Sequence, residues 1–255
     1  MRLRLPMLIV PVFLAVSLAS SLVSRAAAPT TVPATTRPAL HFLAPASVDV
    51  ARLLPMPPRP DTDEARCELR VVRQLSETRK PAEVERAVAE AKLGMSAFAP
   101  VVGPWFTPER LPLVDELLKL AQADSKYFSA TGKAYFSRKR PPDEVRVKPA
   151  DNDKDERSYP SGHATRGILM AWIIAELDPD HRDALMDRAR EIGWDRVIAG
   201  VHYPSDIVAG RVLGQALAQE MDANPEFQRE LAAAKAEFAI VKRRSTESAL
   251  STTPR

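Results

Sequence analysis

The chain has 255 residues, of which 45% are hydrophobic, and this is enough apolar material for one large domain with its own core. Its formal net charge is +3, but three arginines lie within the first 25 residues, and without them 33 basic residues face 33 acidic ones. The overall charge therefore gives no support for nucleic acid or an anionic membrane as a partner. Cys67 is the single cysteine, which excludes an internal disulfide.

Residues 1–28 have the layout of a secretory signal peptide: basic residues come first, then an apolar stretch, then small residues. A single membrane anchor is the alternative, although Pro6 and Pro11 interrupt the apolar stretch. We expect a periplasmic or secreted protein with no stable membrane insertion once the signal is removed.

The remaining chain predicts one helical domain between two extended ends. Residues 29–50 are rich in proline and threonine and predict a linker, and residues 53–60 predict an extended strap that packs across the domain. Residues 51–241 form the expected domain, and residues 242–255 lack apolar spacing and predict a disordered tail.

Within the domain, apolar residues recur every three or four positions and glycines are few, so we predict an all-α fold, a single compact helical bundle. Prolines mark three helix starts, at Thr107–Pro108, Pro179–Asp180 and Pro204. The expected helices span residues 61–77, 81–93, 107–122, 164–177, 180–198, 204–221 and 225–240.

The first stretch with unusual chemistry is "KAYFSRKRPP", in which Lys133 and Arg140 lie seven residues apart. Taken alone, it is typical of a solvated basic face.

The second stretch is "RSYPSGHATRG", residues 157–167, where Ser161, Gly162 and His163 directly precede an apolar helix. The amides of a first helical turn and the helix dipole attract an anion, and glycine lets a ligand approach the backbone. His163 could then give or take a proton beside that anion. The alternative is that Ser161 simply caps the helix.

The third stretch is "DRVIAGVHYPSD", which contains Arg196, His202 and Asp206. A helix that begins at Pro204 places Asp206 in its first turn, within reach of one imidazole nitrogen of His202, and leaves the other nitrogen free as a nucleophile or base. Asp206 could instead serve only the helix dipole. A metal site is disfavoured because Lys133, Arg140 and Arg196 would repel a divalent ion.

Combined in one site, the three stretches supply three cations, a helix N-terminus, a histidine held by a carboxylate and a second histidine. A tetrahedral dianion such as a phosphate ester suits this set.

The order of these three stretches resembles the signature of the type 2 phosphatidic acid phosphatase superfamily, which includes the vanadium haloperoxidases. The sequences "SYPSGH" and "LLPMPPRPDTDEARCELRVVRQLSETR" make the chain similar to the class A bacterial non-specific acid phosphatases in particular. The likeness covers roughly residues 50–220.

The resemblance implies a hydrolase of small phosphate monoesters that needs no cofactor and no metal. His202 would attack phosphorus to form a phosphohistidine, Asp206 would orient His202, and His163 would protonate the leaving group and later activate water. The phosphate would be bound by Lys133, Arg140, Arg196 and the amides of Ser161, Gly162 and His163. An acidic, bell-shaped pH profile follows from these roles.

One departure from the family pattern is Asp195, where these proteins usually carry serine; we expect its side chain to face away from Arg196 and the anion. Three aromatic residues, Trp105, Tyr135 and Phe136, either line the ester side of the site or pack in the bundle.

Several alternatives stay open. A membrane lipid phosphatase shares the signature but needs spanning helices, and no apolar run of about 20 residues follows the leader. A vanadate-dependent haloperoxidase, a non-catalytic phosphate-binding protein and a phosphotransferase acting on alcohols are the others. The sequence leaves open whether the protein forms a homo-oligomer.

Overall fold

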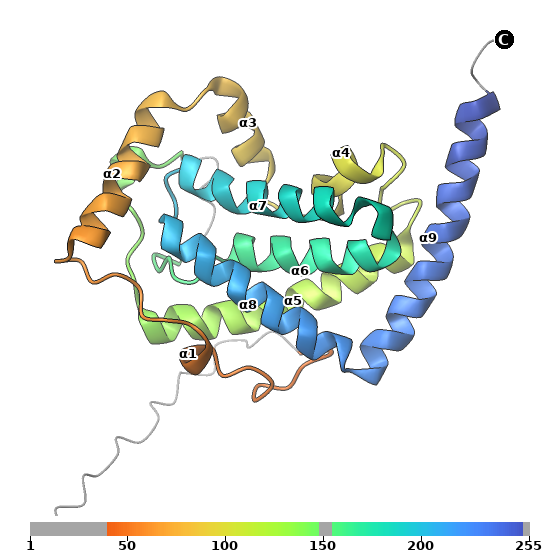
Figure 1. Ribbon diagram of the computed structural model, residues 1–255, viewed down its shortest axis with the longest axis horizontal. Helices are drawn as coiled ribbons and strands as arrows, with labels where there is room; N and C mark the ends of the chain where they lie inside the picture. Colours follow the sequence, from red (N-terminus) through yellow and green to blue (C-terminus); the bar gives the residue numbers. More distant parts are fainter. Residues whose placement is uncertain (1–39, 148–154, 252–255) are drawn as a thin grey trace, which may run out of the picture. The chain divides into compact units, whose positions relative to one another are not determined.

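The computed structural model describes residues 40–147 and 155–251, and its regular structure within these ranges is helical (Figure 1), which confirms the predicted all-α fold. The predicted signal peptide lies outside the described residues. The α-helices are α1 (Val50–Leu53), α2 (Asp63–Thr78), α3 (Pro81–Ala89), α4 (Ala99–Val102), α5 (Pro112–Phe136), α6 (Gly162–Leu177), α7 (Arg182–Ile198), α8 (Pro204–Asp222) and α9 (Pro225–Ser251). Short 3₁₀ turns cover Met95–Phe98, Asp143–Val145 and Pro179–His181.

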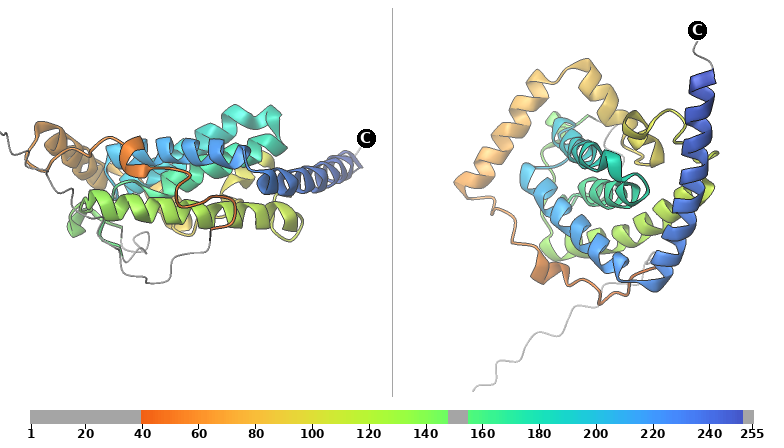
Figure 2. Two further views of the ribbon diagram at one scale, coloured as in Figure 1. Left: turned by 90° about the horizontal axis from the view of Figure 1, so that it is seen from below. Right: turned by 45° about the vertical axis from the view of Figure 1, so that its right-hand side comes forward.

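Helix α6 lies at the centre of this arrangement. It is apolar on all sides, and its residues from Gly167 to Ala171 are fully or almost fully buried, as expected for a core helix. It contacts α5, α7, α8 and α9, and Figure 2 shows α6 and α7 in the middle with the other long helices around them. The first turn of α6, which carries the "PSGH" sequence, is thus held from several sides.

Two glycines of α8 let this helix approach the start of α6. A Cβ atom at Gly210 would lie 2.5 Å from the Ser161 carbonyl oxygen, and one at Gly214 would lie 2.6 Å from that of Thr165. Any larger residue would push the helices apart. The close approach brings residues 161–163 beside the start of α8, where His202 and Asp206 lie.

The predicted helix 107–122 is wrong at both ends. Residues 107–111 form a turn, in which Arg110 and Leu111 donate their amides to the Thr107 carbonyl, and α5 starts at a second proline, Pro112. It runs on to Phe136 and ends at Ser137 in the left-handed conformation (φ 51°).

The described part of the expected linker belongs to the packed domain. Phe42 and Leu43 are buried, and the buried Asp124 carboxylate accepts the amides of His41, Phe42 and Leu43 at 2.7–2.9 Å. The strap packs as expected, because the Tyr159 hydroxyl donates to the Pro55 carbonyl at 2.7 Å.

Helix α9 continues to Ser251, so residues 242–251 are helical rather than a disordered tail. The last turns gain contacts that apolar spacing did not reveal: Lys242 bonds to Asp178 at 2.7 Å, and Arg110 donates to the Ser245 hydroxyl at 3.0 Å.

Candidate active site

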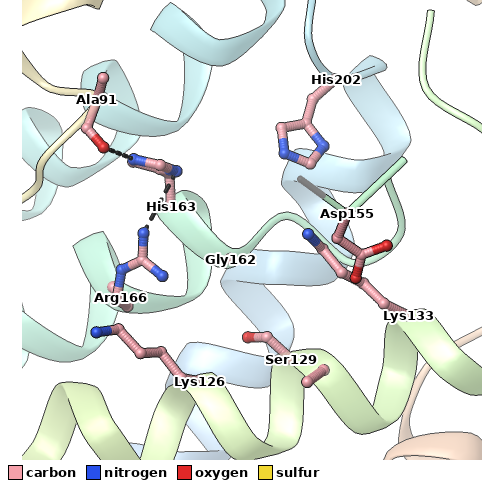
Figure 3. Close-up of a pocket in the computed structure, with 10 residues that line it drawn as sticks. Ala91, Lys126, Ser129, Lys133, Asp155, Gly162, His163, Arg166 and His202 are labelled. Atoms are coloured by element: carbon pink, nitrogen blue, oxygen red, sulfur yellow. Dashed lines mark hydrogen bonds between the residues drawn. The ribbon is translucent and has the colours of Figure 1, made fainter. Parts of the chain in front are cut away.

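A cavity of about 360 Å³ opens where α5, the first turn of α6 and the segment before α8 meet (Figure 3). Four of the eight predicted site residues line it: Lys133, Gly162, His163 and His202. The other four, Arg140, Ser161, Arg196 and Asp206, are buried behind these. The complete lining is Ala91, Lys126, Ser129, Ala130, Lys133, Asp155, Gly162, His163, Arg166 and His202.

Asp206 orients His202 at the N-terminal end of α8. Pro204 starts the helix, and Asp206 in its first turn accepts the Tyr203 amide at 2.8 Å and lies 3.2 Å from His202 Nδ1. A carboxylate only accepts, so this contact places the ring proton on Nδ1 and the lone pair on Nε2. Burial raises the pKa of the Asp206 carboxyl, and the Arg138 guanidinium acts against that shift.

A group of side chains that the sequence did not single out holds Asp206 in turn. Arg138 donates to Asp206 Oδ1 and to Glu68 Oε2, both at 2.7 Å, and its guanidinium stacks over the Tyr203 ring at 4.1 Å. Glu68 also accepts the Ser205 amide at 2.6 Å. Arg138 looked like one member of a basic run, and only tertiary contact reveals its role.

His163 reaches the cavity from the first turn of α6. Its Nε2 lies 3.3 Å from the Ala91 carbonyl and its Nδ1 lies 3.4 Å from Arg166 Nη2. The pKa of His163 is well below its usual value because the imidazole is buried and because Arg166 and Arg196 place positive charge beside it. His163 is therefore neutral at neutral pH.

The expected amide cradle is smaller than predicted. The Ser161 amide donates to the Asp206 carbonyl at 3.0 Å, and the Ser161 hydroxyl caps α6 by accepting the Ala164 amide at 3.4 Å. The amides of Gly162 and His163 belong to the first turn of α6 and have no acceptor within the helix. Two amides, rather than three, are therefore left to bind an anion.

Arg140 and Arg196 stand behind His202 and His163. Arg140 donates to the carbonyls of Asp155 and Val201 at 2.8 Å, and its Nη1 lies 3.3 Å from His202 Nε2. Arg196, only 1% exposed, donates from Nη2 to the Ala87 carbonyl. Its Nε and Nη1 have no hydrogen-bond partner among the described residues, as expected for groups that await an anion.

Asp195 points away from the cavity, as its helical position predicts. Arg86 of α3 binds its carboxylate with two hydrogen bonds, at 2.6 and 2.8 Å. Glu90, at the C-terminal end of α3, pairs with Arg188. Burial and the neighbouring Asp195 raise the pKa of Glu90 to about 7. Asp195 thus anchors α3 over the site rather than competing with the anion.

The three aromatic candidates do not line the cavity. Trp105 packs against Phe106 and Phe238, Phe136 packs against Tyr159, and Tyr135 is 60% exposed.

The described part of the chain offers neither a metal-binding cluster nor a membrane-spanning helix. It contains no group of three or more His, Cys, Asp or Glu side chains arranged to hold a metal ion. None of its helices combines the length and apolar character that a membrane span requires.

Comparison with known proteins points to one family. Residues 118–221 match the sequence profile of the PAP2 superfamily. A protein named non-specific acid phosphatase from Providencia stuartii is 30% identical over 221 residues, which cover 82% of this chain and 89% of that protein. A protein of the same name from Salmonella typhimurium is 35% identical over 147 residues, which cover 55% of this chain and 59% of that one.

Among solved structures, the chain is similar to a transmembrane PAP2-type phosphatidylglycerolphosphate phosphatase from Bacillus subtilis. The TM-score is 0.49 and the identity is 19%, over 64% of this chain and 87% of that one.

Proposed function

The chain belongs to the PAP2 superfamily and is an acid phosphatase within it, and we propose that it hydrolyses phosphate monoesters through a phosphohistidine on His202, without a metal ion. The observation that carries this proposal is that the imidazoles of His163 and His202 line one cavity together with Lys133 and the first turn of α6. These two histidines come from segments 39 residues apart.

The first step transfers the phosphoryl group to the protein. The Nε2 lone pair of His202 attacks phosphorus in line, the bond between phosphorus and the ester oxygen breaks, and the protonated form of His163 gives its proton to the departing oxygen and becomes neutral. Asp206 accepts a hydrogen bond from Nδ1–H of His202 throughout both steps. This hydrogen bond stabilises the positive charge that develops on the His202 ring.

The second step releases phosphate. Neutral His163 takes a proton from water, the water oxygen bonds to phosphorus, and the bond from phosphorus to Nε2 of His202 breaks. Orthophosphate leaves, and both histidines regain their starting protonation states.

Three cations would bind the phosphoryl oxygens. Lys133 lines the cavity, Arg140 Nη1 lies 3.3 Å from His202 Nε2, and the positive charge of Arg196 lies beside His163. Preorganised positive charge of this kind stabilises the charge on the transferring group. It also repels a divalent ion, which supports the proposal that the reaction needs none.

Substitution of the two histidines tests this function. We expect His202→Ala to lower kcat for 4-nitrophenyl phosphate about a thousandfold or more, in buffer with EDTA, because the nucleophile is lost. His163→Ala should accumulate an acid-labile phosphoprotein in rapid-quench experiments. The 4-nitrophenolate leaving group needs little protonation, so the phosphohistidine still forms, but its hydrolysis slows because His163 no longer activates water.

His181→Ala is the matched control. His181 is 43% exposed, pairs with Asp178 and lies outside the cavity lining, so its loss should leave turnover unchanged. Unchanged turnover in His202→Ala, or activity abolished by EDTA alone, would contradict the proposed mechanism.

Export is proposed from the leader-like residues 1–28. N-terminal sequencing of the protein from a periplasmic fraction tests it, and an intact residue 1 would contradict it.

A further inference from the structure

Two basic side chains line the cavity in addition to those of the predicted site: Lys126 of α5 and Arg166 of α6. With Lys133, they place three basic groups against one carboxylate, Asp155, among the described lining residues. In the proposed function, Lys133, Arg140 and Arg196 serve the transferred phosphoryl group, and Lys126 and Arg166 add two basic groups to the same cavity. The additional charge therefore calls for a second anionic group.

Helix α5 presents a polar face to the cavity. Lys126, Ser129 and Lys133 are spaced at i, i+3 and i+7, which places them on one side of the helix. Ser129 is 5% exposed, and its hydroxyl has no hydrogen-bond partner among the described residues. A buried hydroxyl that lines a cavity without a partner is expected to bind a ligand.

Arg166 lies directly against the first turn of α6. Its Nη2 is 3.4 Å from His163 Nδ1, and its Nη1 is 3.4 Å from the place a Cβ atom would take at Gly162. The Ser129 Cβ lies 4.0 Å from that same place. The guanidinium of Arg166 and the side chain of Ser129 therefore flank the same end of the cavity.

That end is the one where the alcohol part of a substrate would lie. In-line attack by His202 requires the leaving oxygen on the opposite face of phosphorus, beside its proton donor His163. Figure 3 shows Lys126 and Arg166 on the His163 side of the cavity and Lys133 on the His202 side.

We propose that Lys126, Ser129 and Arg166 form a subsite for a second anionic group, a carboxylate or a phosphate, carried by the leaving alcohol. This inference rests on the proposed function, because it takes its orientation from the roles of His202 and His163. The preferred substrates would then be phosphate monoesters of anionic alcohols, such as phosphorylated hydroxy acids and bisphosphates, rather than esters of neutral alcohols.

A pair of isosteric substrates tests the subsite: 3-carboxyphenyl phosphate and 3-carbamoylphenyl phosphate differ in one charge. The full-length protein should show the higher kcat/KM for the carboxylate. In Arg166→Gln, this preference should fall about tenfold, as expected for loss of a charge-assisted hydrogen bond. In Lys126→Gln, whose side chain is more exposed, it should fall about threefold. A third substrate, 1,3-phenylene bisphosphate, shows whether a second phosphate is preferred to a carboxylate.

Two variants serve as controls. Lys119→Gln removes the same charge from an exposed position on α5 outside the cavity lining, and it should leave the preference unchanged. Arg166→Lys keeps the charge and should keep most of the preference, which separates charge recognition from a folding defect.

Equal loss of kcat/KM for both substrates in Arg166→Gln would overturn the subsite, because Arg166 would then serve the transferred phosphoryl group or His163 alone. Failure of the proposed function has a different outcome: His202→Ala would hydrolyse both substrates at the original rate, whatever their ratio.

Discussion

At the scale of single residues, the two histidines occupy different electrostatic environments. His202 touches the Asp206 carboxylate, whereas His163 is buried beside the cations of Arg166 and Arg196. Such contrasting surroundings separate a base from an acid without any change in residue type. Arg138 holds the carboxylate that orients His202.

The lowered pKa of His163 predicts the direction of the pH dependence. The acid form of His163 in the free enzyme is populated only at low pH, so kcat/KM should already fall as pH rises through the acidic range below the ordinary histidine pKa. In Arg166→Gln, one of the charges that lower this pKa is gone, and the descending limb should move to higher pH. Measurement of kcat/KM for 4-nitrophenyl phosphate from pH 4 to 9 checks both expectations.

Burial is the largest cause of the shift, so the limb should move only part of the way toward the ordinary histidine pKa. Lys119→Gln should leave the profile in place. A flat profile in the original protein would contradict the assignment of His163 as proton donor.

At the scale of helices, the contact between α6 and α8 joins the two halves of the site. Gly210 allows the Ser161 carbonyl to approach α8, and the Ser161 amide bonds back to the Asp206 carbonyl. The "PSGH" turn and the segment of His202 are therefore fixed to each other by backbone contacts.

Substitution of this glycine tests the role of the contact. Gly210→Ala should destabilise the fold by about 1–3 kcal/mol, because its methyl group would lie 2.5 Å from the Ser161 carbonyl oxygen. It should also lower kcat, since the helices must separate and carry His163 away from His202. Chemical denaturation and steady-state kinetics measure the two effects.

Gly94→Ala is the control, because a Cβ atom there meets nothing within 4 Å. A stable Gly210→Ala variant with full activity would show that α6 and α8 do not need this close approach.

The same helices show how far the sequence predicts the structure. Proline starts and apolar spacing located α2, α3, α6, α7 and α8 well, but α5 was predicted to end near residue 122. Beyond that point its inner face carries Lys126, Ser129 and Lys133, which line a polar cavity and interrupt the amphipathic pattern. The pattern fails there because that face lines the cavity rather than the core.

The site was predictable where it follows local spacing, as for His202 and Asp206, which lie four residues apart at a helix start. Arg138 and Glu68 lie 70 residues apart in the chain, and only the fold makes them partners. The sequence predicted that the Ser161 amide binds the anion, but this amide donates to the Asp206 carbonyl of α8. Tertiary contacts of this kind leave no local signal.

At the scale of the whole molecule, the burial of Arg196 bears on the stability of the fold. Arg196 is almost completely buried, and two of its N–H groups have no partner among the described residues. An anion that accepts from these groups should bind the folded chain and not the unfolded one. Its binding then adds directly to the free energy of unfolding.

Orthophosphate at a hundred times its dissociation constant should therefore stabilise the fold by about 2.7 kcal/mol and raise the melting temperature by roughly 5–10 °C. Arg196→Met should lose most of this gain. Thermal unfolding in phosphate and in chloride at equal ionic strength measures it, and an equal gain in Arg196→Met would place the anion elsewhere.

The partnerless N–H groups of Arg196 also bear on turnover. Orthophosphate that accepts hydrogen bonds from the buried Arg196 guanidinium should dissociate slowly. The enzyme should therefore be inhibited by orthophosphate, the same ion that stabilises it against thermal unfolding. At low phosphate concentration the enzyme should turn over faster and unfold more readily, and at high phosphate concentration it should resist unfolding and be largely inhibited.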